Sequence, residues 1–205
     1  MTINLKNFLT PNKKISKMGE FQEIKHIEGL QVSSVSADLY KNGRDDISLF
    51  YFKEGSNYAS AYTESSIVSE SITWNKKNSK KNIKALFVNT KNANTFTGKQ
   101  GLQSLDEIGE NLAESLTQRE EYERGRKGKS VKPDEILFAS TGVIGEKYPL
   151  EKIKDRIQHL VDNLRSNQNK LIWLKSASAI MTTDTKPKIA FREVKIANKI
   201  IRISG

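Results

Sequence analysis

Two short apolar runs decide the fold class of this sequence. Lys84–Val88 (KALFV) and Glu135–Phe138 (EILF) are compact, and each is followed at once by small polar residues. Central strands of an α/β sheet end in this way, because the strand is buried and the chain meets solvent only at the edge of the sheet. The runs therefore predict a layered α/β architecture with a polar segment after each of two central strands.

Other segments have the pattern of strands nearer the two ends of the chain. Three of them are short, rich in β-branched and aromatic residues and separated by turn material, which predicts a meander over Val32–Tyr40, Asp46–Phe52 and Tyr58–Thr63. The last stretch, KIAFREVKIANKIIRIS, holds two alternating runs on either side of Ala197 and Asn198. This pattern predicts a β-hairpin.

Apolar residues at helical spacing predict three helices. The first is expected to begin at Ser104, which would form a capping box with Glu107. Its buried face would carry Leu105, Ile108, Leu112 and Leu116. The second begins near Pro149, where a missing N–H is harmless, and runs to about Leu164; the third covers Asn169–Met181.

The segment from Glu120 to Pro133 separates the first predicted helix from the strand at Glu135. It is too polar to belong to a core, so we expect a surface loop. With 205 residues, the chain is long enough for one sizeable core. We therefore expect a single α/β domain over residues 1–205.

The composition excludes several kinds of site. No cysteine is present, which excludes disulfides and thiolate metal sites, and His26 and His159 are too few for a histidine-rich metal cluster. No apolar run approaches the roughly 20 residues that a membrane span needs. The first apolar residues are separated by polar ones, unlike a secretory leader. We expect a cytoplasmic protein with no metal, no cofactor and no membrane partner.

The net charge of +10 raises the question of nucleic-acid binding. Much of the excess lies in two stretches, residues 76–82 (KKNSKKN) and 124–132 (RGRKGKSVK), and neither contains an aromatic residue on which a base could stack. A solvated, lysine-rich surface explains these stretches better than a nucleic-acid site. A non-catalytic basic binding module is kept as the less favoured alternative.

Three polar segments are candidates for chemistry. Val88–Gly98 (VNTKNANTFTG) follows one central strand and reads either as a self-bonded asparagine-rich turn or as a ligand-binding loop. Ser140–Gly142 follows the other strand. Thr141 and Gly142 could aim a hydroxyl and a backbone N–H at one point, as an oxyanion hole does, although the spacing alone favours an ordinary connection to the next helix.

The third polar segment, Ala179–Phe191 (AIMTTDTKPKIAF), follows the last predicted helix. It has more hydroxyl groups than a helix stop requires, yet taken alone it reads as a threonine-rich turn. The sequence contains no G-x-S-x-G, no P-loop and no G-x-G-x-x-G motif. The common serine-hydrolase and nucleotide-binding signatures are therefore absent.

Taken in order, these segments resemble the glutamate N-acetyltransferase family, the ornithine acetyltransferases of arginine biosynthesis. The family has a motif like N-S-G-N-A-N-A-x-T-G, then S-T-G-V-I-G, then A-I-M-T-T-D-T-x-P-K. This sequence has NTKNANTFTG (89–98), STGVIG (140–145) and AIMTTDTKPK (179–188), and weaker similarity reaches back to Gly29. Lys91 departs from the motif, which usually has glycine there.

The resemblance implies a mechanism and a set of partners. Family members are precursors that cut themselves before an internal threonine, which becomes the amino-terminal nucleophile of a β chain. That threonine takes acetyl from N-acetylornithine and gives it to glutamate in a ping-pong reaction. Thr141 and Gly142 match the oxyanion-hole pair, and Thr182 matches a substrate-binding threonine.

The nucleophile and its motif are not found in the sequence, so the resemblance implies an amino-terminal α chain that works with a β chain, expected as an (αβ)₂ heterotetramer. Use of acetyl-CoA as an additional donor is left open. So is a related autoprocessed amidohydrolase or aminopeptidase, in which water replaces glutamate as the acceptor.

Overall fold

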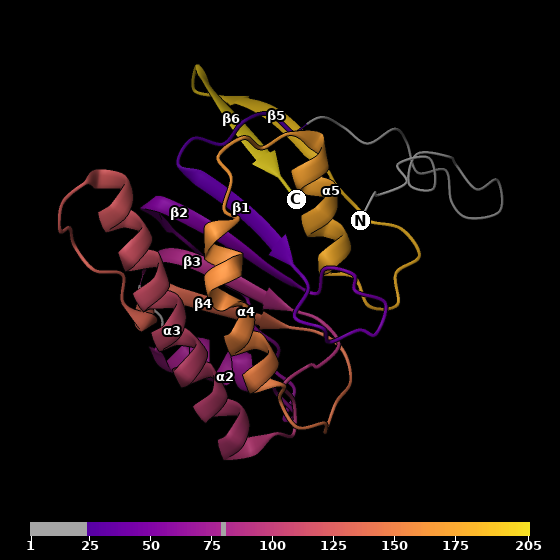
Figure 1. Cartoon of the computed structure of the whole chain (residues 1–205). Coiled ribbons are helices and arrows are strands. Elements are labelled where there is room, and N and C mark those ends of the chain that lie inside the picture. Colours follow the sequence, from indigo (N-terminus) through magenta and orange to yellow (C-terminus); the bar gives the residue numbers. More distant parts are fainter. Residues whose placement is uncertain (1–23, 79–80) are drawn as a thin grey trace.

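A four-stranded sheet forms the centre of the chain in the computed structural model, which describes residues 24–78 and 81–205 (Figure 1). The elements in chain order are β1 (Leu30–Val35), β2 (Ile47–Asn57), α2 (Glu70–Asn78), β3 (Asn82–Asn89), α3 (Gly98–Arg124), the 3₁₀ turn η1 (Pro133–Glu135), β4 (Ile136–Ser140), α4 (Leu150–Asp162), α5 (Lys170–Ala179), β5 (Phe191–Ile196) and β6 (Lys199–Ser204).

The sheet has the order β1-β2-β3-β4. β1 and β3 each pair antiparallel with β2, whereas β3 and β4 are parallel. As a result the end of β1, the start of β2 and the ends of β3 and β4 all lie at one edge of the sheet. The predicted α/β fold is confirmed, and the polar segments after β3 and β4 do meet at this edge.

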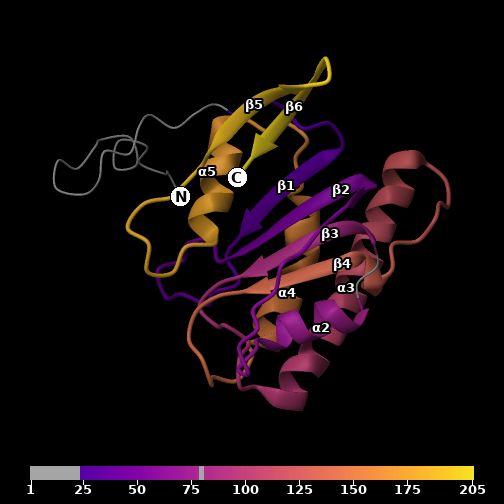
Figure 2. The same ribbon diagram turned by 180° about the vertical axis from the view of Figure 1, so that it is seen from behind.

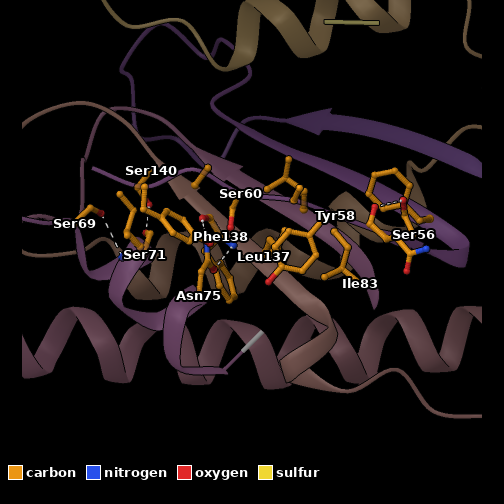
Figure 3. Close-up of a pocket in the computed structure, with 17 residues that line it drawn as sticks. Ser56, Tyr58, Ser60, Ser69, Ser71, Asn75, Ile83, Leu137, Phe138 and Ser140 are labelled. Carbon is orange, nitrogen blue, oxygen red and sulfur yellow. Dashed lines mark hydrogen bonds between the residues drawn. The ribbon is translucent and has the colours of Figure 1, made fainter. Parts of the chain in front are cut away.

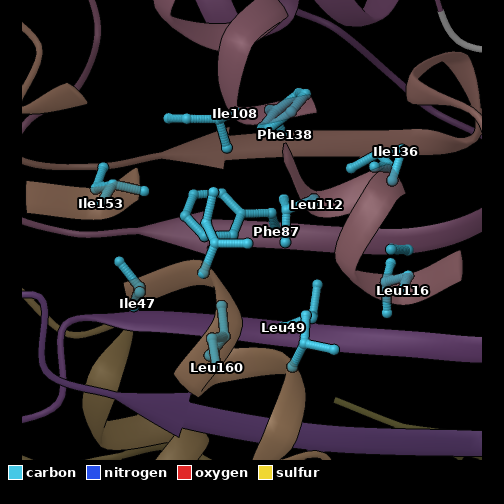
Figure 4. Packing of buried hydrophobic residues seen from close by; sticks show 14 of the residues in the cluster. Ile47, Leu49, Phe87, Ile108, Leu112, Leu116, Ile136, Phe138, Ile153 and Leu160 are labelled. Atoms are coloured by element: carbon cyan, nitrogen blue, oxygen red, sulfur yellow. The ribbon is translucent and has the colours of Figure 1, made fainter. Parts of the chain in front are cut away.

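Helices α3 and α4 cover one face of the sheet, as Figure 1 shows, and the main core lies between them and the strands. Figure 4 shows part of this core, in which Leu49 and Phe87 of the strands lie among Leu112 of α3 and Leu160 of α4. All four side chains are fully buried. Burying a side chain of this size stabilises the fold by about 1.5–3 kcal/mol, so this layer holds the strand ends in place.

The opposite face is covered unevenly. Helix α5 packs there against β1 and β2, where the Trp173 ring contacts Phe50 and Ser176 bonds to Ser48. Helix α2 runs beside the free edge of β4 (Figure 2). There the Asn75 side chain both donates to the Phe138 carbonyl (2.8 Å) and accepts from its N–H (3.0 Å), as a neighbouring strand would. The Asn75 amide therefore satisfies the backbone N–H and carbonyl of Phe138 at the free edge of β4.

The predicted hairpin is confirmed as β5 and β6, joined through Ala197 and Asn198, both of which have positive φ. It lies apart from the main sheet in both views. Its apolar side chains remain exposed; they are Val194, Ile196, Ile200, Ile201 and Ile203.

Several predicted boundaries are wrong, for physical reasons. No strand forms over Tyr58–Thr63, because those aromatic residues line a cavity instead of pairing. The strand predicted to reach Tyr40 ends at Val35, where the buried Asp46 carboxylate accepts the N–H groups of Ala37 and Leu39 and turns the chain.

The first predicted helix also begins in the wrong place. Ser104 lies inside α3, which starts six residues earlier at Gly98 and ends at Arg124, so the loop predicted from Glu120 is shorter. Its apolar face is confirmed, as are the second and third helices. Helix α2 was not predicted. Among the described residues, none of the helices is long and apolar enough to cross a membrane. The expectation about a leader concerns residues 1–23, outside the described part.

Candidate active site

The loops after β3 and β4 are tied together by their own backbones, and we call residues 89–98 and 140–147 the interlocked loops. Thr141 N–H donates to the Asn89 carbonyl (3.1 Å), Val143 N–H to Lys91 (2.9 Å) and Ala93 N–H back to Val143 (3.0 Å). These bonds extend the parallel pairing of β3 and β4 beyond the strands. The conformation around Thr141 is thus set mainly by main-chain contacts.

The three asparagines of the first loop are structural. Asn89, Asn92 and Asn94 are buried. The Asn89 amide donates to the carbonyl of Asn92, and Asn92 donates to the carbonyls of Glu146 and Lys147 in the other loop. Because these side chains are used inside the loops, the self-bonded reading of this segment is the one that the structure supports.

A chain of side-chain hydrogen bonds runs beneath the candidate site. The Asn89 carbonyl oxygen Oδ1 accepts from the Ser140 hydroxyl (2.7 Å) and from the Tyr148 hydroxyl (2.8 Å), and Ser140 also pairs with Ser71 of α2 (2.7 Å). Burial raises the pKa of the Tyr148 phenol well above its ordinary value. Tyr148 therefore remains a hydrogen-bond donor, and the chain holds Ser140 directly before Thr141.

Gly142 occupies a conformation that no other residue fits. Its φ is 140°, and a Cβ built there would lie 2.2 Å from the Lys91 carbonyl carbon and 2.4 Å from its oxygen. The Gly142 N–H has no hydrogen-bond partner within the described residues, and the residue is exposed. The half-buried Thr141 hydroxyl likewise has none there. Both groups are thus available to an acyl oxygen.

Thr182 lies outside the interlocked loops. It is half-buried and follows the end of α5, in residues 180–190, which we call the Thr182 segment. Arg44 holds this segment to the end of α5 by donating from Nη2 to the carbonyls of Ser178 in the helix and Met181 in the segment, both at 2.7 Å. No hydrogen bond joins Thr182 to Thr141 or Gly142 in the described part of the chain.

The loop between β1 and β2 contacts both the interlocked loops and the Thr182 segment. The Arg44 guanidinium lies 4.5 Å from the centre of the Tyr40 ring, and the Lys91 ammonium lies 5.8 Å from the same centre. The Asp46 carboxylate fixes this loop by accepting the N–H groups of Leu39 and Ala37, although burial raises its pKa. All three candidate residues therefore stand at the same edge of the sheet, on elements joined through Tyr40.

Next to this edge is a cavity of about 540 Å³. Figure 3 shows Ser69, Ser71 and Ser140 at one end and Tyr58 and Ser56 at the other. None of the described residues that line it is charged, and of the described residues 140–145 only Ser140 lines it. The cavity suits a neutral group and offers nothing to an ionic one.

Sequence reasoning missed Ser71, Tyr148 and Arg44. Ser71 lies in the unpredicted helix, Tyr148 lies just before α4, and Arg44 is one of several charged residues in a turn. Nothing in their spacing distinguishes them. No group of three His, Asp or Glu side chains in the described residues could hold a metal ion.

Two crystal structures have the same fold. The protein named arginine biosynthesis bifunctional protein argJ from Bacillus halodurans superposes with a TM-score of 0.74 at 20% identity, covering 91% of this chain and 92% of that one. The ornithine acetyltransferase from Mycobacterium tuberculosis, crystallised with ornithine, gives 0.72 at 20% identity, with 90% and 91% covered. The chain thus has the α/β fold of ornithine acetyltransferase structures.

Sequence comparison identifies the family to which the chain belongs. Residues 31–205 match the ArgJ family, and the chain belongs to this family. It is 35% identical over 180 residues to the arginine biosynthesis bifunctional protein ArgJ of Gluconobacter oxydans, covering 87% of this chain and 38% of that protein. It is 29% identical to the mitochondrial protein of that name from Schizosaccharomyces pombe, with 94% and 42% covered.

The chain spans about two fifths of the length of these curated relatives. The family expected from the three motifs is confirmed.

Proposed function

We propose that this chain is the α part of a glutamate N-acetyltransferase, which transfers acetyl from N-acetylornithine to glutamate. The observation that carries the proposal is the free N–H of Gly142 beside the free hydroxyl of Thr141, on a backbone that only glycine can adopt. Two donors without internal partners, held rigidly at the end of a strand, suit an oxyanion that forms only in the transition state.

The proposed reaction has two acyl-transfer steps. A threonine hydroxyl from the β part attacks the acetyl carbonyl carbon of N-acetylornithine, and the carbonyl oxygen becomes an oxyanion that accepts bonds from Thr141 and Gly142. The C–N bond then breaks, the threonine proton leaves with the amine as ornithine, and an acetyl ester remains on the enzyme. The glutamate amine attacks this ester through a second oxyanion and restores the hydroxyl.

Thr182 is proposed as a substrate-binding residue. Its position at the same edge of the sheet, on a segment linked through Arg44 and Tyr40, supports this role. In this proposal the Thr182 hydroxyl binds polar groups of the amino-acid substrate, while the reacting carbonyl lies at Thr141 and Gly142.

The proposed partner is a β chain from the same precursor, in an (αβ)₂ heterotetramer. The exposed isoleucines of the β5–β6 hairpin support a partner, because apolar patches of this kind usually mark interaction surfaces. We further propose that residues 1–205 act as one α/β domain and that the protein works in the cytoplasm, which the absence of cysteine suits.

The test uses the complete protein incubated with N-acetylornithine, with and without glutamate. We expect N-acetylglutamate and ornithine to form together and little acetate to appear. Release of acetate at the same rate with or without glutamate would identify an amidohydrolase instead. A third reaction with acetyl-CoA and glutamate shows whether that donor is also used.

A further inference from the structure

The main chain of Lys91 is in direct contact with the proposed oxyanion site. Its backbone carbonyl accepts the Val143 N–H at 2.9 Å and lies against Gly142, where it leaves no room for a Cβ. The side chain is exposed, and its ammonium has no carboxylate partner among the described residues. The residue whose main chain packs against Gly142 therefore also carries a positive charge that no described carboxylate neutralises.

The backbone of Lys91 is strained. Its φ is 72°, in the left-handed region where a residue with a Cβ is disfavoured by about 1–2 kcal/mol. Glycine would adopt the same φ without this penalty. Strained residues that persist beside a site are candidates for a function, because the rest of the structure must hold them there.

The ammonium lies near an aromatic ring that also contacts Arg44. It is 5.8 Å from the centre of the Tyr40 ring, and the same ring contacts Arg44, which bonds to the carbonyl of Met181 directly before Thr182. Lys91 is thus linked to both candidate regions, to Gly142 through its main chain and to the residue before Thr182 through Tyr40 and Arg44. The described residues that line the neighbouring cavity carry no charge, so they do not supply this interaction.

We propose that Lys91 binds a carboxylate of the amino-acid substrate and thereby acts as a specificity-determining residue. The inference rests on the proposed function and adds to it the group that recognises the substrate charge. N-Acetylornithine and glutamate both carry a carboxylate next to the reacting nitrogen, and glutamate carries a second one on its side chain. Either carboxylate matches an ammonium, and the experiment separates them.

The experiment measures KM and kcat for both substrates on the complete protein and on three Lys91 variants. Lys91→Gln removes the charge and keeps much of the side chain, Lys91→Gly also removes the backbone strain, and Lys91→Arg keeps the charge. We expect KM to rise about tenfold for Gln and Gly, the usual size of one lost charge-assisted hydrogen bond, and to change little for Arg.

Lys99→Gln serves as the matched control. Lys99 is exposed in the first turn of α3, so its removal lowers the net charge by the same amount without touching the site. A Lys91→Gly protein that unfolds at the same or a higher temperature than the unmodified protein shows that its raised KM is not caused by misfolding.

Substrate analogues identify the carboxylate. If Lys91 binds the carboxylate beside the reacting nitrogen, KM rises for both substrates, and the Gln variant no longer discriminates glutamate from its α-amide. If it binds the side-chain carboxylate, KM rises for glutamate alone, and the variant no longer discriminates glutamate from glutamine.

The inference is overturned if KM for both substrates is the same in the Gln variant as in the Lys99→Gln control. It is also overturned if the Arg variant is as impaired as the Gln variant. Calorimetric binding of glutamate and N-acetylornithine to the same proteins decides the inference separately. A protein that binds them through Lys91 but transfers no acetyl would contradict the proposed function alone.

Discussion

The interlocked loops and the Thr182 segment bring candidate residues to the same edge of the sheet by different means. Around Thr141, backbone bonds in both directions, three buried asparagines and one obligatory glycine fix the conformation. Around Thr182, the hydrogen bonds that the described residues make to the rest of the site come from the guanidinium of Arg44. The proposed oxyanion half is therefore built into the main chain, whereas the proposed binding half depends on a side chain.

The largest effect is expected from Gly142→Ala. The added methyl would overlap the Lys91 carbonyl, and φ at 140° is unfavourable for alanine, so we expect a loss of about 3 kcal/mol of stability and loss of nearly all acetyl transfer. Thermal unfolding and turnover measure both. Gly145→Ala is the control, since it also has positive φ but open space, and we expect only the strain of about 1–2 kcal/mol. Equal behaviour of the two variants would contradict the close contact.

Thr141→Val tests the same half without disturbing its backbone. Valine keeps the shape and removes the hydroxyl, so turnover should fall by about 10²- to 10³-fold while the unfolding temperature stays nearly constant. Steady-state kinetics and a thermal melt give the two quantities. Unchanged turnover in a folded variant would show that the hydroxyl has no role in the oxyanion site.

Arg44→Met tests the dependence of the other half on one side chain. Methionine keeps an aliphatic stem but donates no hydrogen bond to the carbonyls of Ser178 and Met181, so the Thr182 segment should move more freely. We expect KM to rise about tenfold with a much smaller change in kcat. Hydrogen exchange over residues 178–190 reports the mobility, and Arg44→Lys should have an intermediate effect. A fall in kcat alone would mean that the two halves are not independent.

The smallest effect is expected from Thr182→Ala. Loss of one hydroxyl that binds substrate should raise KM about five- to tenfold and leave kcat nearly unchanged. The ratio of kcat to KM for N-acetylornithine measures it. A loss of turnover at constant KM would assign Thr182 to the chemical step and remove the contrast between the two halves.

The sequence predicted the elements that have a regular apolar pattern. The strands at Lys84–Val88 and Glu135–Phe138, the apolar face of α3, helices α4 and α5 and the terminal hairpin are all present. Each is recognised by its period, because the same face of the element is buried along its whole length.

The elements that were missed bury polar groups instead. The buried residues of α2 are Ser71, Trp74 and Asn75, and Asn75 is held by the backbone of Phe138 rather than by apolar packing. The start of α3 buries Gly101 and Ser104, and the single apolar residue Leu102 before Leu105 is too little to form a periodic pattern. Contacts between residues distant in the chain determine where these helices form, so the local sequence pattern does not predict them.

The candidate site likewise contains residues that the sequence predicted and contacts that it did not. The positions of Thr141, Gly142 and Thr182 followed from resemblance to family motifs, and their roles stay predictions. The contacts of Arg44, Tyr40 and Lys91 were not foreseeable, since an exposed loop has no period. What the structure adds is which groups are already bonded and which are free.

The parallel register of β3 and β4 has a practical consequence for protein engineering. Asn89 pairs with Ser140, the last residue of β4, so the two polar loops begin at the same position along the strands. This register does not depend on the length of the segment that connects β3 to β4. The connection includes the exposed residues 125–130, which lie near the far end of β4, away from the site. Because insertions in exposed loops are tolerated well, this basic loop is a suitable place to attach a purification tag or a fluorescent reporter. A label there would follow the protein without altering the groups that we assign to acetyl transfer.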